Sequence, residues 1–219
     1  MKIWNKNSNL DKIIEEFTVG KDYLLDQRLV KYDCQASIAH AEMLHEINIL
    51  TQDEKEKLIQ KLNEIIKLQE KGEYKIKKSE EDCHTAIENY LTRELGDTGK
   101  KIHTARSRND QVLTALRLYY RDEINRIKKL IKKNIESLDN FIDQFGQIQF
   151  PGYTHTRKAM PSTVSMWAGG LKDSMQDNLD HLAFYAKLID QSPLGTAAGY
   201  GAPLKIKRDY TAGKLGFDR

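Results

Sequence analysis

The sequence has 219 residues, of which 39% are hydrophobic and 31% are charged. Its 35 basic and 32 acidic residues give a net charge of +3, a balance that predicts no particular class of partner. This composition excludes collagen-like, low-complexity and disordered chains. No proline precedes Pro151, which disfavours an all-β fold with turns at short, regular spacing, so we expect a protein of long helices.

The sequence predicts neither a secretory leader nor a membrane span. Asp11 and Glu15 interrupt the first residues, and no apolar stretch reaches the roughly 20 residues that a membrane helix needs. Cys34 and Cys83 are too few for a disulfide framework or a zinc site, and neither lies in a cluster with ligand spacing. We therefore expect a soluble cytoplasmic protein with two partly buried thiols.

Helical periodicity predicts two helices early in the chain. Apolar residues three and four positions apart predict a helix over residues 22–47. Thr51 followed by Glu54 is a capping box, which predicts a second helix from there to about Lys71. Gly72 suits the position directly after the end of that helix.

Two shorter patterns follow. Residues 73–77 alternate in polarity and predict a short strand or an extended link. Beyond them, Ser79 and Asp82 resemble another cap, and the apolar residues after them predict a third helix that ends at Gly96.

Two long helices are predicted in the second half of the chain. Apolar residues keep nearly one face for almost forty residues after Ser107, with no glycine before Gly146. A helix this long cannot bury its stripe against itself, so it predicts a bundle or an oligomer. We expect Pro161 in the first turn of the next long helix, which continues to about Ile189.

A basic amphipathic segment lies within the first of these long helices. Its cations have no interleaved aromatic residues to stack bases, which favours a solvated outer face over a nucleic-acid site. The segment comprises Arg121, Arg126, Lys128, Lys129, Lys132 and Lys133.

Three loops break the helical pattern: residues 101–112, 151–161 and 192–204. Each gathers small, hydroxyl or charged residues at a junction of long helices, where functional side chains usually lie. Gly152 in the second loop allows a close approach. The glycines of the third loop form a possible anion cradle, but no lysine follows at the spacing of a nucleotide phosphate loop.

The first loop predicts either a helix cap or a carboxylate site. Ser107 with Asp110 three residues on is a cap that needs no ligand. However, Arg106, Arg108 and Asn109 crowd the same helix N-terminus, where backbone N–H groups favour an anion. A guanidinium and an amide there can hold a carboxylate at two points, and this loop alone leaves both interpretations open.

Together these segments resemble the argininosuccinate lyases, within the fumarase/aspartase superfamily. The similarity is carried by HTARSRNDQV, GYTHTRKAMP, PLGTAAGYGAPL and EEDCHTAIENYL, and weaker similarity extends over almost the whole chain. Arg108 before Asn109 and Asp110 distinguishes the sequence from fumarases and aspartases, which carry serine there.

The resemblance implies an all-α fold: an N-terminal helical domain over residues 1–106, then the first, incomplete part of a long-helix bundle over residues 107–219. It implies the reversible β-elimination of argininosuccinate to arginine and fumarate, in arginine biosynthesis, with no metal and no organic cofactor. It also implies a homotetramer with active sites shared among subunits, and neither a nucleic-acid nor a membrane partner.

The resemblance also implies roles for six residues. His155 is expected to transfer or orient a proton, and is the candidate catalytic residue. His84 matches a family histidine near the site, although a polar residue at a helix start explains it equally well. Substrate binding is expected of Ser107, Arg108, Asn109, Thr154 and His84.

The sequence also departs from the family. Thr156 and Arg157 replace the usual Leu-Gln, and Gly20 replaces a substrate-contacting serine of many members. The serine favoured as catalytic base lies in a second half that this sequence lacks, so we expect an N-terminal half that is inactive without its complement. Two alternatives stay open: a non-catalytic helical assembly protein or split-enzyme subunit, and a lyase of the same superfamily acting on another succinyl substrate.

Overall fold

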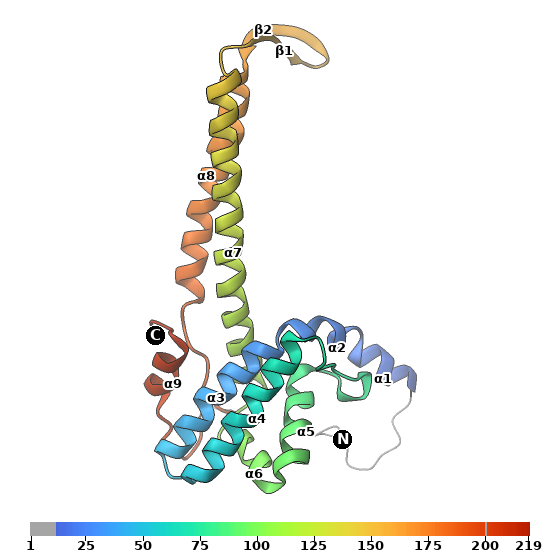
Figure 1. Cartoon of the computed structure of the whole chain (residues 1–219), viewed down its shortest axis with the longest axis vertical. Helices are drawn as coiled ribbons and strands as arrows, with labels where there is room; N and C mark the ends of the chain where they lie inside the picture. Colours follow the sequence, from blue (N-terminus) through green and yellow to red (C-terminus); the bar gives the residue numbers. More distant parts are fainter. Residues whose placement is uncertain (1–11, 200) are drawn as a thin grey trace. The chain divides into compact units, whose positions relative to one another are not determined.

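The computed structural model describes residues 12–199 and 201–219, which are mostly helical (Figure 1). The predicted all-α class is confirmed. The chain forms two compact units: one combines Met1–Tyr119 with Asp190–Arg219, and the other is Tyr120–Ile189. The domain division between residues 106 and 107 stays a prediction. No helix within the described residues is both long and apolar enough to cross a membrane.

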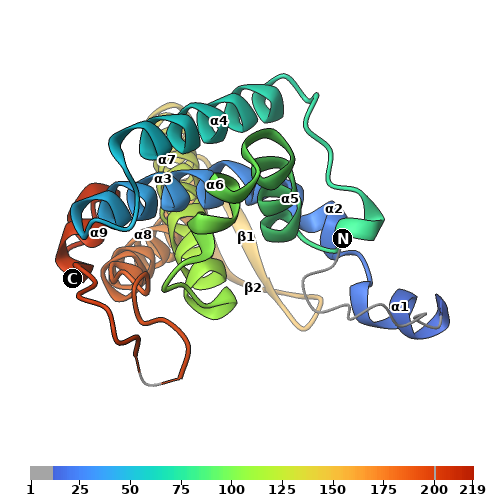
Figure 2. The ribbon, with the colours of Figure 1, turned by 90° about the horizontal axis from the view of Figure 1, so that it is seen from below.

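The core of the first unit lies between α3 (Val30–Glu46), α4 (Gln52–Glu70) and α5 (Cys83–Leu95). Helices α3 and α4 lie side by side in both views of the ribbon (Figures 1 and 2). Each fully buried leucine or isoleucine contributes about 1.5–3 kcal/mol, so this cluster stabilises the unit. Its largest fully buried apolar side chains are Met43, Leu44, Leu58, Leu62, Ile65, Ile87, Leu91 and Ile102.

The ends of α4 are fixed as the sequence predicts. The hydroxyl of Thr51 accepts the backbone N–H of Glu54 at 3.2 Å, and the Glu54 carboxylate accepts the N–H of Thr51 at 3.0 Å. At the other end Gly72 has a φ of +75°, and the N–H of Glu73 donates to the carbonyl of Leu68 at 2.8 Å. This Schellman arrangement requires a left-handed residue, which explains the glycine.

The prediction of one helix over residues 22–47 is wrong. The segment divides into α2 (Asp22–Leu25), a 3-10 turn η1 (Asp26–Arg28) and α3. Within the turn, Gln27 donates to the carbonyl of Tyr74 at 2.9 Å and accepts the N–H of Ile76 at 3.3 Å. These contacts hold residues 73–77 as an extended link, not a strand. They also explain the break in the helix, because Gln27 makes both of them from the 3-10 turn.

Several short elements complete the first unit and were not predicted. Asp82 caps α5 by accepting the N–H of Thr85 at 2.6 Å, so the predicted cap is Asp82, while Ser79 lies in a short 3-10 turn. The short elements are α1 (Lys12–Val19), η2 (Lys78–Glu80), α6 (Asp97–Lys100), η3 (Lys101–His103) and α9 (Arg208–Leu215).

The second unit contains most of α7 (Arg108–Phe145) and all of α8 (Val164–Ile189). The two long helices are confirmed, and Lys172 of α8 pairs with Asp139 of α7 at 2.5 Å. Much of their apolar surface stays exposed, in accord with stripes too long for one chain to bury. The exposed side chains include Leu130, Met166, Trp167, Leu171, Phe184 and Tyr185.

The expected place of Pro161 in a helix is wrong. Pro161 lies in β2 (Arg157–Thr163), which pairs antiparallel with β1 (Gln149–Thr154), and its partner in the register is Pro151. Prolines are tolerated here because both strands of a two-stranded ribbon have a free edge. Helix α8 begins three residues later, where the hydroxyl of Thr163 accepts the N–H of Met166 at 3.1 Å.

Candidate functional site

Ser107 and Asp110 cap the N-terminus of α7, as predicted. The Asp110 carboxylate accepts the backbone N–H of Ser107 at 3.0 Å, and the Ser107 hydroxyl accepts the N–H of Asn109 at 3.3 Å. The cap fixes Arg108 and Asn109 in the first turn of a 38-residue helix. Unpaired N–H groups give that end a partial positive charge, so the cap and an anion site are compatible.

Arg108 and Asn109 of this first turn reach the surface. The guanidinium of Arg108 lies 3.4 Å from a carboxylate oxygen of Asp82 and donates to the hydroxyl of Thr85 at 3.2 Å. The Arg108 side chain is 30% exposed, and Asn109 lies at the surface. A guanidinium has five N–H donors and these two contacts use only two of them, so Arg108 keeps donors that can bind a carboxylate.

Asp110 also holds the third loop, residues 192–204, against the start of α7. Its second oxygen accepts the backbone N–H of Ala197 at 2.8 Å, in the segment with positive φ at Gly195 and Ala197. Burial raises the pKa of Asp110, against the effect of the hydrogen bonds from Ala197 and Ser107. The structure thus joins two of the three loops singled out from the sequence, residues 101–112 and 192–204.

His84 belongs to a buried polar network behind this turn. Its Nδ1 lies 3.0 Å from an oxygen of Asp33, and both side chains are almost completely buried. The amide of Gln111 donates to both Asp33 oxygens, at 3.1 and 2.9 Å. Burial alone would raise the pKa of Asp33, but His84, Arg106 and Gln111 together lower it to about 2. Asp33 is therefore a carboxylate at neutral pH and His84 donates to it.

Arg106 also lies in this interior. It is 5% exposed and donates to the buried hydroxyl of Ser37 at 2.8 Å, so it faces away from the surface on which Asn109 lies. Of the two arginines that flank Ser107, Arg108 is the one with access to solvent. Sequence reasoning missed the network of Asp33, Ser37 and Gln111.

Thr154 and His155 lie in the second unit, at the tip of the hairpin. Thr154 pairs with Arg157 across a two-residue turn of His155 and Thr156, whose φ values are +50° and +64°. Two positive values are typical of a type I′ turn, which glycine and asparagine favour. A histidine and a β-branched threonine are strained there, and strain of this kind often marks functional positions.

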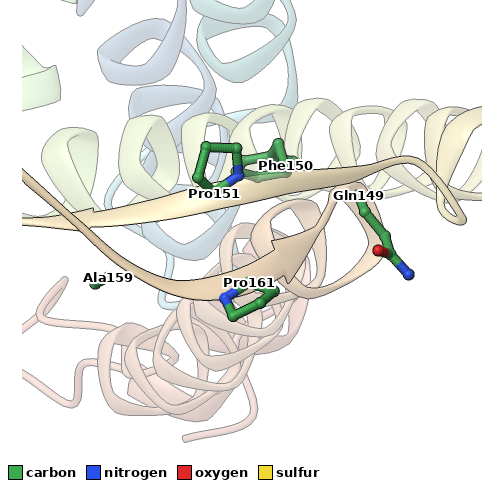
Figure 3. Close-up of a pocket in the computed structure, with 5 residues that line it drawn as sticks. All are labelled: Gln149, Phe150, Pro151, Ala159 and Pro161. Atoms are coloured by element: carbon green, nitrogen blue, oxygen red, sulfur yellow. The ribbon is translucent and has the colours of Figure 1, made fainter.

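The base of the hairpin carries an apolar hollow of about 300 Å³. Figure 3 shows its lining: Gln149, Phe150 and Pro151 of β1, with Ala159 and Pro161 of β2. None of the predicted site residues lines it. Nearby, a register shift between Pro151 and Tyr153 leaves Gly152 so close to β2 that a Cβ there would lie 2.8 Å from the carbonyl oxygen of Met160.

A family model described as Lyase matches residues 1–219. The chain belongs to the lyase family. The lyase chain is 56% identical over 218 residues to an argininosuccinate lyase of Thermotoga neapolitana and covers 55% of that protein. It is 41% identical over 217 residues to an argininosuccinate lyase of Parabacteroides distasonis and covers 49% of it. The predicted resemblance is therefore confirmed, and the chain spans about half the length of the curated relatives it matches.

Two solved structures share the fold of this lyase chain. An EDDS lyase variant with bound fumarate is 26% identical, with a TM-score of 0.78 over 97% of the lyase chain and 42% of its own. A fumarate lyase:delta crystallin from Brucella melitensis in native form is 18% identical, with a TM-score of 0.74 over 94% of the lyase chain and 49% of its own. The second likeness shows the fold alone.

Proposed function

We propose that this chain forms part of an argininosuccinate lyase, which cleaves argininosuccinate reversibly into arginine and fumarate. The observation that carries the proposal is the capped start of α7, which presents Arg108 and Asn109 at a positive helix end. The identity of 56% to an argininosuccinate lyase along the whole chain supports it, as does the fumarate bound to an EDDS lyase of the same fold.

In this proposal the first turn of α7 binds the part of the substrate that becomes fumarate. The Arg108 fork and the amide of Asn109 hold one carboxylate, and the hydroxyl of Ser107 donates a further hydrogen bond. When a proton leaves the adjacent carbon, negative charge grows on that carboxylate. Donors already fixed at a helix N-terminus stabilise this charge without reorganisation, which lowers the barrier to C–N cleavage.

In the proposed tetramer, the hairpin tip of another subunit supplies further groups. Thr154 donates to a carboxylate of the substrate, and His155 transfers or orients a proton in catalysis. The strain at His155 and Thr156 supports this role, because positive φ values cost free energy that a purely structural turn would avoid. His84 forms a buried pair with Asp33 and precedes Thr85, whose hydroxyl accepts a hydrogen bond from Arg108. In this way His84 helps to position Arg108.

We further infer that the active enzyme is a cytoplasmic homotetramer in which a complementary C-terminal half completes each site. The test compares the 219-residue chain alone with the chain mixed with the C-terminal half of an argininosuccinate lyase, and fumarate release is followed by its ultraviolet absorbance. We expect turnover only in the mixture. Turnover by the chain alone would contradict the need for a complement.

The same assay separates the alternatives. Release of fumarate from adenylosuccinate but not from argininosuccinate would favour a lyase with another succinyl substrate. No release from either substrate, in a mixture shown by sedimentation to have assembled, would favour a non-catalytic helical assembly protein.

A further inference from the structure

The 3-10 turn η1 brings an acidic side chain to the start of α5. The carboxylate of Asp26 accepts the backbone N–H of Cys83 at 3.3 Å. One ligand atom each of Asp26, Cys83 and His84 all lie within 4.8 Å of one another. Cys83 and His84 are buried and Asp26 is half-buried, so the group lies just below the surface. This proximity depends on the break between α2 and α3, which the periodicity of the sequence does not reveal.

The orientation of His84 suits a metal ligand. Its Nδ1 lies 3.0 Å from an oxygen of the buried Asp33 carboxylate, so Nε2 is the ring nitrogen that would bind a metal ion. A ligating histidine almost always has such an outer carboxylate or carbonyl partner, which fixes the tautomer and makes the ring nitrogen more basic. Asp33 is fully buried and is itself held by Gln111, so the imidazole is locked in place.

The charges around the group favour a cation. The carboxylates of Asp22 and Asp82 lie near that of Asp26 and add negative charge beside the group. The carboxylates of Asp33, Asp26 and Asp82 lie near the Cys83 thiol, so the surroundings of the sulfur are also acidic. The N-terminus of α5 opposes a cation, but two carboxylates, those of Asp26 and Asp82, accept hydrogen bonds from it.

We propose that Asp26, Cys83 and His84 form a Zn²⁺ site in which a water molecule is the fourth ligand. One sulfur, one imidazole nitrogen and one carboxylate oxygen are a borderline-soft donor set, which suits Zn²⁺ better than Mg²⁺ or Ca²⁺. Binding converts the Cys83 thiol to a thiolate and releases its proton to solvent, with no change of oxidation state. Zn²⁺ bonds of about 2.0–2.3 Å require the three ligand atoms to move slightly closer together.

The site goes beyond the proposed lyase function, although it adjoins the residues of that function. Cys83 and His84 lie between Asp82 and Thr85, the two residues that contact the guanidinium of Arg108. An ion held there is therefore expected to alter the position of Arg108, which gives Zn²⁺ a route to modulate carboxylate binding.

Cobalt titration of the whole 219-residue chain tests the site, because Co²⁺ occupies zinc sites and has a spectrum. We expect visible d–d bands and a near-ultraviolet thiolate-to-cobalt charge-transfer band, both removed by Zn²⁺. The substitution Cys83→Ser should abolish the charge-transfer band. The matched control Cys34→Ser changes the other buried thiol and should leave the band intact. Asp26→Asn should weaken affinity by at least about tenfold, the lower end of what even outer partners contribute.

Three results would overturn the proposal: no charge-transfer band in the unsubstituted chain, a band that persists in Cys83→Ser, or a band lost only in Cys34→Ser. If circular dichroism shows that Cys83→Ser does not fold, alkylation of the unsubstituted chain decides. Mass spectrometry should then find Cys83 protected by Zn²⁺, and equal alkylation with and without Zn²⁺ would contradict the site. No readout here depends on lyase activity, so the site and the proposed function fail separately.

Discussion

The carboxylate of Asp110 accepts the backbone N–H of Ala197 at 2.8 Å, which joins the start of α7 to a loop 87 residues further along the chain. Its other oxygen accepts the N–H of Ser107 at 3.0 Å, and the side chain is 1% exposed. One buried carboxylate therefore fixes both the turn that presents Arg108 and the segment around Gly195.

Asp110→Asn should destabilise the first unit. An amide keeps one acceptor oxygen but turns an NH₂ group towards a backbone N–H, so one buried donor loses its partner, which costs about 1–3 kcal/mol. Urea unfolding measures the loss, and faster hydrogen exchange at Ala197 locates it. Asp97→Asn, a change at a side chain that is 92% exposed, is the control and should stay within about 0.5 kcal/mol. Equal unfolding midpoints for Asp110→Asn and the original chain would contradict this account.

His40 should make the first unit sensitive to acid. Its buried imidazole donates from Nε2 to the carbonyl of Thr104 at 2.9 Å, and burial with the nearby Arg106 cation lowers its pKa from 6.5 to about 3. The pKa of His40 is lower in the folded chain than in the unfolded chain. Its contribution to the free energy of unfolding is therefore fully present above about pH 6.5 and is lost as the pH falls towards 3. Acidification from about pH 7 to about pH 4.5 should cost about 2–3 kcal/mol at this residue.

The substitution His40→Gln isolates that contribution, because a glutamine amide can donate to Thr104 but does not titrate. Urea unfolding at several pH values should show a weaker pH dependence for His40→Gln than for the original chain. His181→Gln changes an exposed histidine and should leave the pH dependence unaltered. Parallel curves for His40→Gln and the original chain would exclude the role of His40.

The long elements could be predicted because local signals specify them. The capping box at Thr51, the glycine after α4 and the periodicity of α7 depend on neighbours within one or two turns. The break at η1 could not be predicted, because it depends on contacts of Gln27 with Tyr74, far away in the sequence. The hairpin was missed because Pro151 and Pro161 read as loop and helix signals, whereas a two-stranded ribbon tolerates them at its free edges.

The candidate site divides in the same way. The cap of Ser107 and Asp110 was visible in the sequence, but its link to Ala197 was not, since no local pattern records a contact across 87 residues. The sequence does contain one signal for the buried network. Asp33, Ser37 and His40 recur at helical spacing on α3, and polar residues along a helix face that is otherwise buried indicate a satisfied interior network. The partnership of Asp26 with Cys83 gave no signal at all.

The hairpin tip should be more stable with a residue suited to positive φ. Thr156→Gly removes a β-branched side chain at a φ of +64° and should stabilise the hairpin by about 1 kcal/mol. This gain is reduced by the loss of the hydrogen bond that the Thr156 hydroxyl donates to the carbonyl of His155. Gly152→Ala should have the opposite effect, because its Cβ would lie 2.8 Å from the Met160 carbonyl oxygen. Hydrogen exchange of the β1 and β2 amides measures both. Faster exchange in Thr156→Gly than in the original chain would show that the turn is not strained.

Arg108 should be the dominant carboxylate anchor of the reconstituted enzyme. Loss of a charge-assisted contact costs about 1.5–3 kcal/mol, so Arg108→Ala should lower kcat/KM by about 10–100-fold or more while the helical circular dichroism stays unchanged. Arg108→Lys keeps the charge but loses the fork, and should recover only part of the activity. Arg126→Ala, on the exposed face of α7 where Arg126 pairs with Glu123, is the matched control and should retain activity. Full activity in Arg108→Ala would exclude the carboxylate role, because Arg108 is the arginine beside Ser107 that reaches solvent.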